Sequence, residues 1–311
     1  MNRSFITWLG LILIGVCEWF NYSRQRDARQ NDIPWGGEGV SPLRVSTVQG
    51  TPKDDLHLLF IGNSYTSVHD IPKQVADIAS SDSGNSTQLF VQSITRGGVT
   101  LKELWEEGKA ADAIRSRHWD YVVIQEQSFW AITNIEASTD YMERFDKLAH
   151  QSGAKTVLYL TWPRKPGSHW YTDGQTAFLR TPDYMLHQFI RQTYTVSLIT
   201  GASTADVGIY WWRVLKEYPQ IELYEPDGTH QSMAGSYLAA LVFYKMLTHR
   251  DVTRTTFLPA GVSETDADTL RTVVSQPLPM PGPAGQSLGH RQGRSNAAAG
   301  HSPPTQGRPT R

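Results

Sequence analysis

Cysteine is almost absent from this chain, since Cys17 is the only one among its 311 residues. A single cysteine forms no disulfide within the chain, and it excludes a cluster of thiolates around a metal. The ten histidines show no metal-ligand spacing such as His-Glu-x-x-His. We therefore expect a chemistry that needs neither a metal nor another cofactor.

An excess of one charge is missing as well. Lysine and arginine together number 29, against 30 aspartate and glutamate residues. A strong basic excess is the usual mark of a chain that binds nucleic acid or an acidic surface. The even balance gives no reason to expect a nucleic-acid partner.

The N-terminal apolar run is short. It follows Arg3 and extends over thirteen mostly apolar residues, from Phe5 to Cys17. This is the length of the apolar part of a signal peptide, and it is short for a membrane span. No clean cleavage site follows, and arginines beyond the run leave the orientation undecided. We predict that residues 1–30 are a signal peptide or membrane anchor and that the protein is exported or membrane-anchored, in contact with the membrane through this segment. The alternative is a soluble chain with an apolar leader of no consequence.

Acidic residues are absent from residues 276–311, which hold seven prolines, four arginines and almost nothing apolar to bury. Such a composition is typical of a disordered tail. Residues 31–55 are rich in proline and glycine and are predicted to be a linker. One domain therefore remains, over residues 56–275.

Short apolar segments alternate with segments of helical spacing along this domain. The pattern predicts strands at 58–61, 87–94, 121–124, 156–162 and 202–208, and helices at 68–80, 100–116, 139–151, from about 184, and at 210–216, 232–247 and 263–274. This alternation is typical of a mostly parallel sheet with helices on both faces. We predict an α/β fold, a three-layer α/β/α sandwich.

Polar or glycine-rich clusters follow the predicted strands. In such a sheet the strands end at one edge, where open α/β folds bind their ligands. The clusters are Gly62-Asn63-Ser64, Gly97-Gly98, Gln125-Glu126-Gln127 and, before the last strong helix, Asp227-Gly228-Thr229-His230.

The first and last clusters contain the residue types of nucleophilic catalysis. A serine hydroxyl attacks a carbonyl when a histidine removes its proton, and a carboxylate fixes the tautomer of that histidine. Asp227 and His230 are three residues apart in a loop, so both side chains can lie on one side of it. Each motif alone also fits a plainer interpretation, namely that Ser64 caps a helix and Asp227 caps a polar loop. Residues 56–275 contain no Gly-x-Ser-x-Gly nucleophile elbow, so an ordinary α/β-hydrolase is not indicated.

Taken together, these motifs resemble the SGNH (GDSL-like) hydrolases. The resemblance covers residues 56–250 and keeps the order and spacing of the family's blocks. Its most specific part is Asp227-Gly-Thr-His-Gln-Ser-Met-Ala-Gly235, because family members often read Asp-x-x-His-x-Ser-x-x-Gly there. The sandwich expected from the resemblance is of the SGNH, flavodoxin-like type.

The resemblance implies a role for each matching residue. Ser64 is the expected nucleophile, and its backbone N–H is part of the oxyanion hole. His230 is the expected general base and then acid, oriented by Asp227. Gly98 is expected to give a second backbone N–H, although Gly97 is an alternative match.

The chain departs from the family pattern in two blocks. Asn63 stands where the family usually has aspartate, and it carries no charge. The third block usually supplies an asparagine to the oxyanion hole, whereas this chain has glutamines. Gln127 matches better by position, while Gln125 is the first polar residue after the strand, and the sequence leaves both open. A glutamine-containing third block resembles the carbohydrate-acetylesterase branches of the family more than the lipase-like ones.

Tryptophans near the strand ends suggest how a substrate is held. Trp162 and Trp170 are expected to stack on a sugar ring or to form a wall of the acyl pocket, unless they are ordinary packing residues. The sequence thus predicts a serine esterase that acts on a small-molecule or glycan ester, with acetyl on a carbohydrate as the preferred substrate. The alternatives are a lysophospholipase or acyltransferase with the same three residues, or a non-catalytic glycan-binding relative.

Overall fold

A computed structural model describes residues 55–278 of the chain. The predicted leader and nearly all of the predicted linker lie outside these residues, as does the predicted tail apart from its first three positions. Within 55–278, no helix has both the length and the apolar character needed to cross a membrane.

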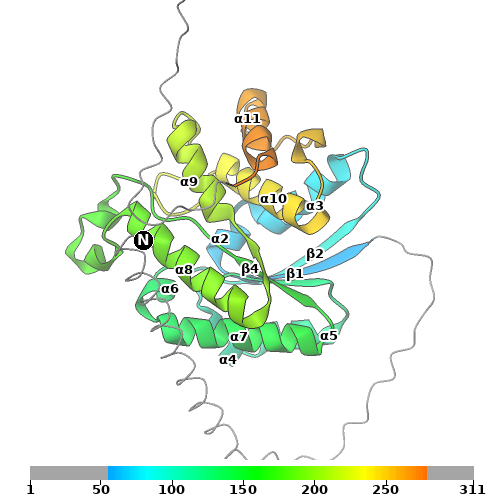
Figure 1. Cartoon of the computed structure of the whole chain (residues 1–311), viewed down its shortest axis with the longest axis vertical. Helices are drawn as coiled ribbons and strands as arrows, with labels where there is room; N and C mark the ends of the chain where they lie inside the picture. The colour runs from blue at the N-terminus through cyan, green and yellow to red at the C-terminus, as the bar shows by residue number, and fades with distance from the viewer. Residues whose placement is uncertain (1–54, 279–311) are drawn as a thin grey trace, which may run out of the picture. The chain divides into compact units, whose positions relative to one another are not determined.

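The centre of the described region is a five-stranded sheet (Figure 1). Its strands are β1 (Leu56–Gly62), β2 (Leu89–Thr95), β3 (Tyr121–Ile124), β4 (Lys155–Tyr159) and β5 (Ser203–Ala205). They lie in the order β2-β1-β3-β4-β5, and every neighbouring pair is parallel. The carboxyl ends of all five strands therefore meet at one edge, and the predicted mostly parallel sheet is confirmed.

Helices cover both faces of the sheet (Figure 1). One layer is formed by α3 (Ile71–Ser81), α9 (Val207–Glu217), α10 (Met233–Thr248) and α11 (Glu264–Ser275). The other is formed by α4 (Leu101–Glu106), α5 (Lys109–Ser116) and α7 (Ile135–Gln151), beside which lies α8 (Pro182–Thr200). Two single-turn helices, α2 (Ser64–Ser67) and α6 (Trp130–Thr133), follow β1 and β3. The three-layer α/β/α sandwich is as predicted.

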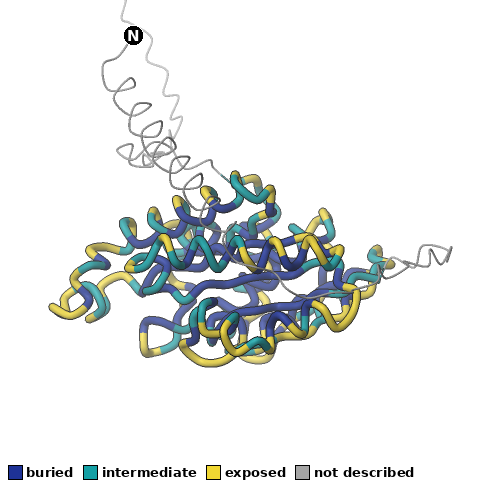
Figure 2. Tube along the Cα trace, turned by 90° about the horizontal axis from the view of Figure 1, so that it is seen from below, coloured by how far each residue is buried: buried dark blue, intermediate teal, exposed yellow. Residues whose placement is uncertain are grey.

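The four apolar residues of β1 explain why the sheet lies between two cores. Leu58 and Phe60 point into the core beneath α3 and α10, while Leu59 and Ile61 point into the core beneath α7. All four are fully buried, and each stabilises the fold by about 1.5–3 kcal/mol. Figure 2 shows the buried strands between helices whose outer sides are exposed.

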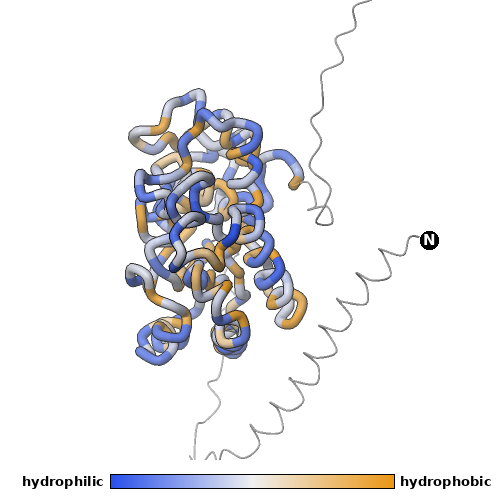
Figure 3. Tube along the Cα trace, turned by 90° about the vertical axis from the view of Figure 1, so that its left-hand side faces the viewer, coloured by the Kyte–Doolittle hydropathy of each residue, from blue (hydrophilic) through white to orange (hydrophobic). Residues whose placement is uncertain are grey.

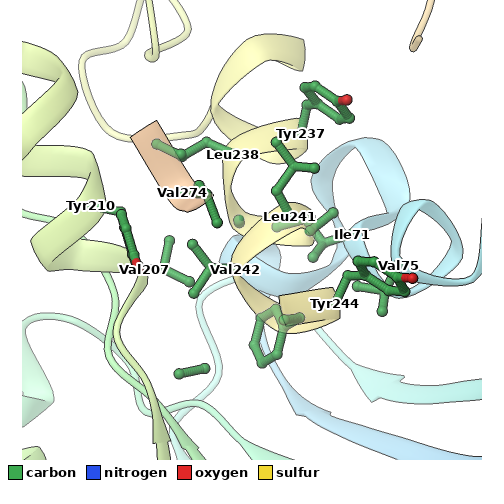
Figure 4. Close-up of a cluster of buried hydrophobic side chains, with 14 of the residues drawn as sticks. Ile71, Val75, Val207, Tyr210, Tyr237, Leu238, Leu241, Val242, Tyr244 and Val274 are labelled. Carbon is green, nitrogen blue, oxygen red and sulfur yellow. The ribbon is translucent and has the colours of Figure 1, made fainter. Parts of the chain in front are cut away.

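The larger core is organised around α10. Its side chains Leu238, Leu241 and Tyr244 are fully buried and meet Ile71 of α3 and Val274 of α11 (Figure 4). Eleven residues of α10 are buried, so this helix is apolar on nearly all sides. The surface helices instead alternate between polar and apolar residues, as the hydropathy of the trace shows (Figure 3).

Several predicted helix ends are confirmed by their hydrogen bonds. Thr100 and Glu103 form a capping box where the helix predicted from residue 100 begins, and Ser232 caps α10 at the predicted start of that helix. Asp70 caps α3 in a left-handed conformation.

Other predicted boundaries differ from the structure. The helix predicted over 100–116 is divided into α4 and α5. Gly108, between them, has a φ of +78°, which lies outside the right-handed helical region and interrupts the helix. A 3-10 turn occupies Val68–Asp70 at the start of the helix predicted over 68–80. The helix predicted over 139–151 begins earlier, at Ile135, and the strand predicted over 156–162 ends at Tyr159.

Candidate active site

Ser64 lies at the turn where β1 passes into α2, on the carboxyl edge of the sheet. Asn63 caps α2 by accepting a hydrogen bond from the Tyr65 N–H at 3.0 Å. Ser64 is thus the first helical residue, where a backbone N–H has no partner inside the helix. A Cβ on Gly62 would lie 2.5 Å from Gln125 Oε1 and 2.8 Å from Thr66 Oγ1, so a larger residue here would displace two side chains that hold the serine turn.

A chain of two hydrogen bonds joins the serine to the loop before α10. His230 Nε2 lies 2.8 Å from Ser64 Oγ, and His230 Nδ1 lies 2.6 Å from Asp227 Oδ2. Because an ionised carboxylate only accepts, Nδ1 carries the proton and Nε2 is free to accept from the serine hydroxyl. The residues singled out in the first and last clusters are therefore in direct contact.

The Asp227 carboxylate is held in its ionised form. Partial burial acts to raise its pKa, but hydrogen bonds from the His230 ring and from the His230 and Thr229 N–H groups outweigh this. The pKa of Asp227 is therefore below its usual value. About half of this side chain is exposed to solvent, so the pair is accessible to a ligand.

Gln231 fixes the histidine loop against α2, a role that the sequence did not reveal. It is fully buried, and its Nε2 donates to the carbonyl oxygens of Ser64, Tyr65 and Val68 at 3.0–3.3 Å. The Ser64 carbonyl also accepts from the Val68 N–H, so Gln231 adds to the hydrogen bonds that close this single-turn helix. The sequence does not indicate this role of Gln231, because the residues that it contacts are more than 160 positions away.

The loop after β2 lies against the serine turn. Asn63 Nδ2 donates to the Val99 carbonyl at 3.1 Å, which joins the first and second clusters. Gly98 has a φ of +69°, a conformation that favours glycine, whereas Gly97 does not have a positive φ. Of the two glycines, Gly98 is therefore the one whose special backbone shapes this turn.

The structure separates the roles of the two glutamines. Gln125 is buried, its Oε1 accepts from the Asn63 N–H and the Thr66 hydroxyl, and its Nε2 donates to the Glu126 carbonyl. The oxygen of this amide thus holds the serine turn, and its nitrogen is taken up by the backbone of its own loop. Gln127 accepts from the Trp130 N–H at the start of α6, and its Nε2 has no acceptor among residues 55–278. Of the two glutamines, Gln127 is therefore the one whose side-chain N–H groups are free to bind a ligand.

Glu126, between the glutamines, is a buried acid. Its Oε1 accepts from the N–H groups of Leu101 and Gln127 at 3.0 and 2.7 Å. Burial raises the pKa of Glu126 to about 7, although these two hydrogen bonds act in the opposite direction. The fold therefore favours the protonated form, and the stability that this gives is present below about pH 4.5 and lost as the pH rises through 7.

We expect Glu126→Gln to remove this pH dependence, because glutamine keeps the acceptor oxygen and has no proton to lose. Between pH 5 and pH 8 the free energy of unfolding of the wild type should fall by up to about 3 kcal/mol more than that of the variant. Urea unfolding at the two pH values measures the difference. The same fall in both proteins would contradict it.

The two tryptophans expected at the substrate differ in position. Trp162 is fully buried, stacked between Tyr65 and Trp211 at 4.6 and 4.1 Å, with its Nε1 donating to the Thr229 carbonyl. The expectation that Trp162 touches substrate is therefore wrong, because its ring supports the site from the core. Trp170 is only partly buried and donates to the Asp227 carbonyl at 3.2 Å, beside the hydrogen-bonded pair.

The segment after β4 completes the surroundings of the loop. It contains two 3-10 helices, His169–Tyr171 and Gly174–Leu179. The Lys165 N–H donates to the Gly228 carbonyl at 2.8 Å. Among residues 55–278, no group of three or more histidine, cysteine, aspartate or glutamate side chains is arranged to hold a metal ion.

Comparisons with known proteins found similar folds among solved structures. No protein-family model and no curated protein matches the sequence. A protein from Slackia heliotrinireducens, described as a candidate SGNH hydrolase, is 27% identical, with a TM-score of 0.54 over 62% of this chain and 99% of its own. A DUF4886 family protein from Bacteroides uniformis is 15% identical, with a TM-score of 0.58 over 71% of this chain and 94% of its own, and it shares the fold.

The fold is an SGNH-like α/β/α sandwich, and the chain is similar to a protein described as a candidate SGNH hydrolase. This similarity supports a hydrolase that acts on carboxylic ester bonds.

Proposed function

We propose that this protein is a serine esterase that removes short acyl groups, with acetyl on a carbohydrate as its substrate class. The observation that carries the proposal is the pair of hydrogen bonds from Ser64 to His230 and from His230 to Asp227. A hydroxyl whose proton is already directed at an oriented imidazole has the geometry of an activated nucleophile.

In the proposed reaction, Ser64 Oγ attacks the ester carbonyl carbon while its proton passes to His230 Nε2. The resulting oxyanion accepts hydrogen bonds from the N–H groups of Ser64 and Gly98 and from Gln127 Nε2. The C–O bond to the alcohol then breaks, and His230 returns the proton to the leaving oxygen. Water, activated by the same imidazole, attacks the acyl-enzyme and releases the acid.

The carbohydrate part of the proposal has two supports. A glutamine-containing third block resembles that of carbohydrate acetylesterases. Trp170 is partly exposed beside Asp227, where an indole ring could stack on a sugar. The proposal also includes export or membrane anchoring through residues 1–30, and this part depends on their sequence alone.

A series of p-nitrophenyl esters tests the proposal. Acetate, butyrate and octanoate are compared, with Ser64→Ala protein as the blank, and the account predicts Ser64-dependent turnover that is fastest on acetate. A preference for octanoate would favour a lysophospholipase. Transfer of the acyl group to an added alcohol in place of water would favour an acyltransferase. Turnover of no ester by a folded protein would favour the non-catalytic glycan-binding relative.

The glutamines should respond differently to substitution. Gln127→Ala should lower kcat by about 10²- to 10³-fold, because it removes one donor to the oxyanion, and should also cost about 1 kcal/mol of stability, because the Trp130 N–H loses its acceptor. Gln125→Ala should lower the free energy of unfolding by about 1–3 kcal/mol, because the Asn63 N–H loses its buried acceptor. Ester kinetics and urea unfolding of both variants measure this. An unchanged kcat in Gln127→Ala would remove it from the oxyanion hole.

Asp227→Asn should lower kcat by up to about 10⁴-fold, and by less than the loss of the nucleophile. Asparagine can present an amide N–H to Nδ1, which then accepts instead of donating. The proton moves to Nε2, and Nε2 can no longer accept the proton of the Ser64 hydroxyl. Steady-state kinetics on p-nitrophenyl acetate give the ratio. Wild-type kcat in this variant would show that Asp227 does not orient His230.

A further inference from the structure

Arg164 is a buried arginine that neither the serine chemistry nor the core explains. It follows β4 on the edge of the sheet where Ser64 lies, and only 4% of its surface is exposed. A buried arginine is normally paired with a carboxylate, because an uncompensated buried charge is costly. No ion pair joins Arg164 to a carboxylate in the part of the chain that the structure describes, and Asp227 acts on it only at longer range.

Three aromatic rings surround the guanidinium. Its central carbon lies 4.5 Å from the ring centre of Phe129, 5.2 Å from that of Trp170 and 5.6 Å from that of Tyr65. Each ring belongs to a different segment of the site. Tyr65 follows Ser64, and Phe129 lies two residues after Gln127. Trp170 donates a hydrogen bond to the Asp227 carbonyl. The cation is thus placed between the three segments of the proposed reaction centre.

Several hydrogen-bond donors in this cluster have no acceptor. Nη2 of Arg164 donates to Ser128 Oγ at 3.0 Å, but Nε and Nη1 have no partner among residues 55–278. The hydroxyl of Tyr65 is likewise buried without a partner. Burial lowers the pKa of Arg164 only to about 10, so the group is charged at neutral pH. A cation with unused N–H groups is what a carboxylate binds by charge-assisted hydrogen bonds.

We propose that Arg164 binds a carboxylate of the substrate, so that the ester cleaved at Ser64 carries an acidic group near the scissile bond, as an acetyl ester of an acidic sugar does. In this proposal the carboxylate reaches the guanidinium from the side of Phe129 and Trp170, two partly exposed residues, whereas Tyr65 forms the buried wall. This inference rests on the proposed esterase function and names its substrate class.

Matched ester pairs test the inference with the full chain. The first pair is the 3-O-acetyl ester of methyl glucuronide and that of methyl glucoside, and the second is an aryl hemisuccinate and the aryl butyrate. The wild type should favour the carboxylate member of at least one pair by about tenfold to a hundredfold in kcat/KM. In Arg164→Gln this ratio should fall to about one, and Arg164→Lys should keep part of it.

Arg180→Gln is the matched control. Arg180 also lies over an aromatic ring, 4.5 Å from the centre of Tyr184, but it is exposed, and its loss should leave the ratio unchanged. A wild type that hydrolyses p-nitrophenyl acetate but favours neither carboxylate ester would overturn the inference and leave the esterase intact. Arg164 would then only stack within the aromatic cluster.

A binding measurement separates this inference from the esterase itself. If no ester is hydrolysed, the proposed function fails, and calorimetry on Ser64→Ala protein decides the role of Arg164 alone. Methyl glucuronide should bind at least about tenfold more tightly than methyl glucoside, and adding Arg164→Gln or Arg164→Lys should reduce the difference. Equal binding of the two sugars, or none, overturns the inference.

Discussion

Ser64→Ala should lower kcat/KM for p-nitrophenyl acetate by about 10⁴-fold or more, the scale on which serine hydrolases lose activity without their nucleophile. The hydroxyl is the only group at this position that can form the acyl-enzyme. Its removal should change the stability little, because Asn63 and not Ser64 caps α2. Steady-state kinetics and thermal unfolding of the variant measure the two effects.

Ser67→Ala provides the control for this substitution. Ser67 is an exposed serine at the last position of α2, away from the imidazole, and its loss should leave kcat/KM unchanged. Equal rates for the wild type and Ser64→Ala would show that hydrolysis, if present, proceeds elsewhere.

His230→Ala should reduce kcat/KM about as much as Ser64→Ala, because a serine without a base is not deprotonated at neutral pH. The two losses should not add in the double variant, since the residues act as one unit. The loop should keep its path in the variant, because the Glu225 N–H bonds the backbone carbonyl of residue 230 and Gln231 remains anchored to α2.

His187→Ala is the matched control for the histidine. His187 is exposed on α8 and should be replaced without loss of activity. Additive losses in the Ser64→Ala, His230→Ala double variant would contradict a shared proton transfer between the two side chains.

The sequence was sufficient for the features that depend on local patterns. Four consecutive apolar residues predicted the strand at 58–61, which the structure buries on both faces, and helical spacing predicted a helix from residue 100, where α4 begins. The contact between Ser64 and the Asp227 loop followed from the fold class, since parallel strands bring distant loops to one edge.

Features that depend on long-range packing were beyond the sequence. Gln125 and Gln127 are the same residue type in the same loop, so the sequence does not assign their roles. The hydrogen bond from Asn63 to Gln125 is what distinguishes them in the structure. The position of Trp162 after a predicted strand favours contact with substrate, yet its ring is enclosed by Tyr65 and Trp211. Nothing in the sequence distinguishes Arg164, because a lone arginine in a loop is usually exposed and its aromatic neighbours come from three separate segments.

The most direct test of the account is covalent labelling of the nucleophile. The full chain is treated with an alkyl fluorophosphonate, which reacts with activated serines, and the modified residue is located by mass spectrometry of the digested protein. The account predicts one phosphonylated serine, Ser64, with labelling abolished in Ser64→Ala and strongly slowed in His230→Ala. Labelling at another serine, or none at Ser64 in a folded protein, would contradict it.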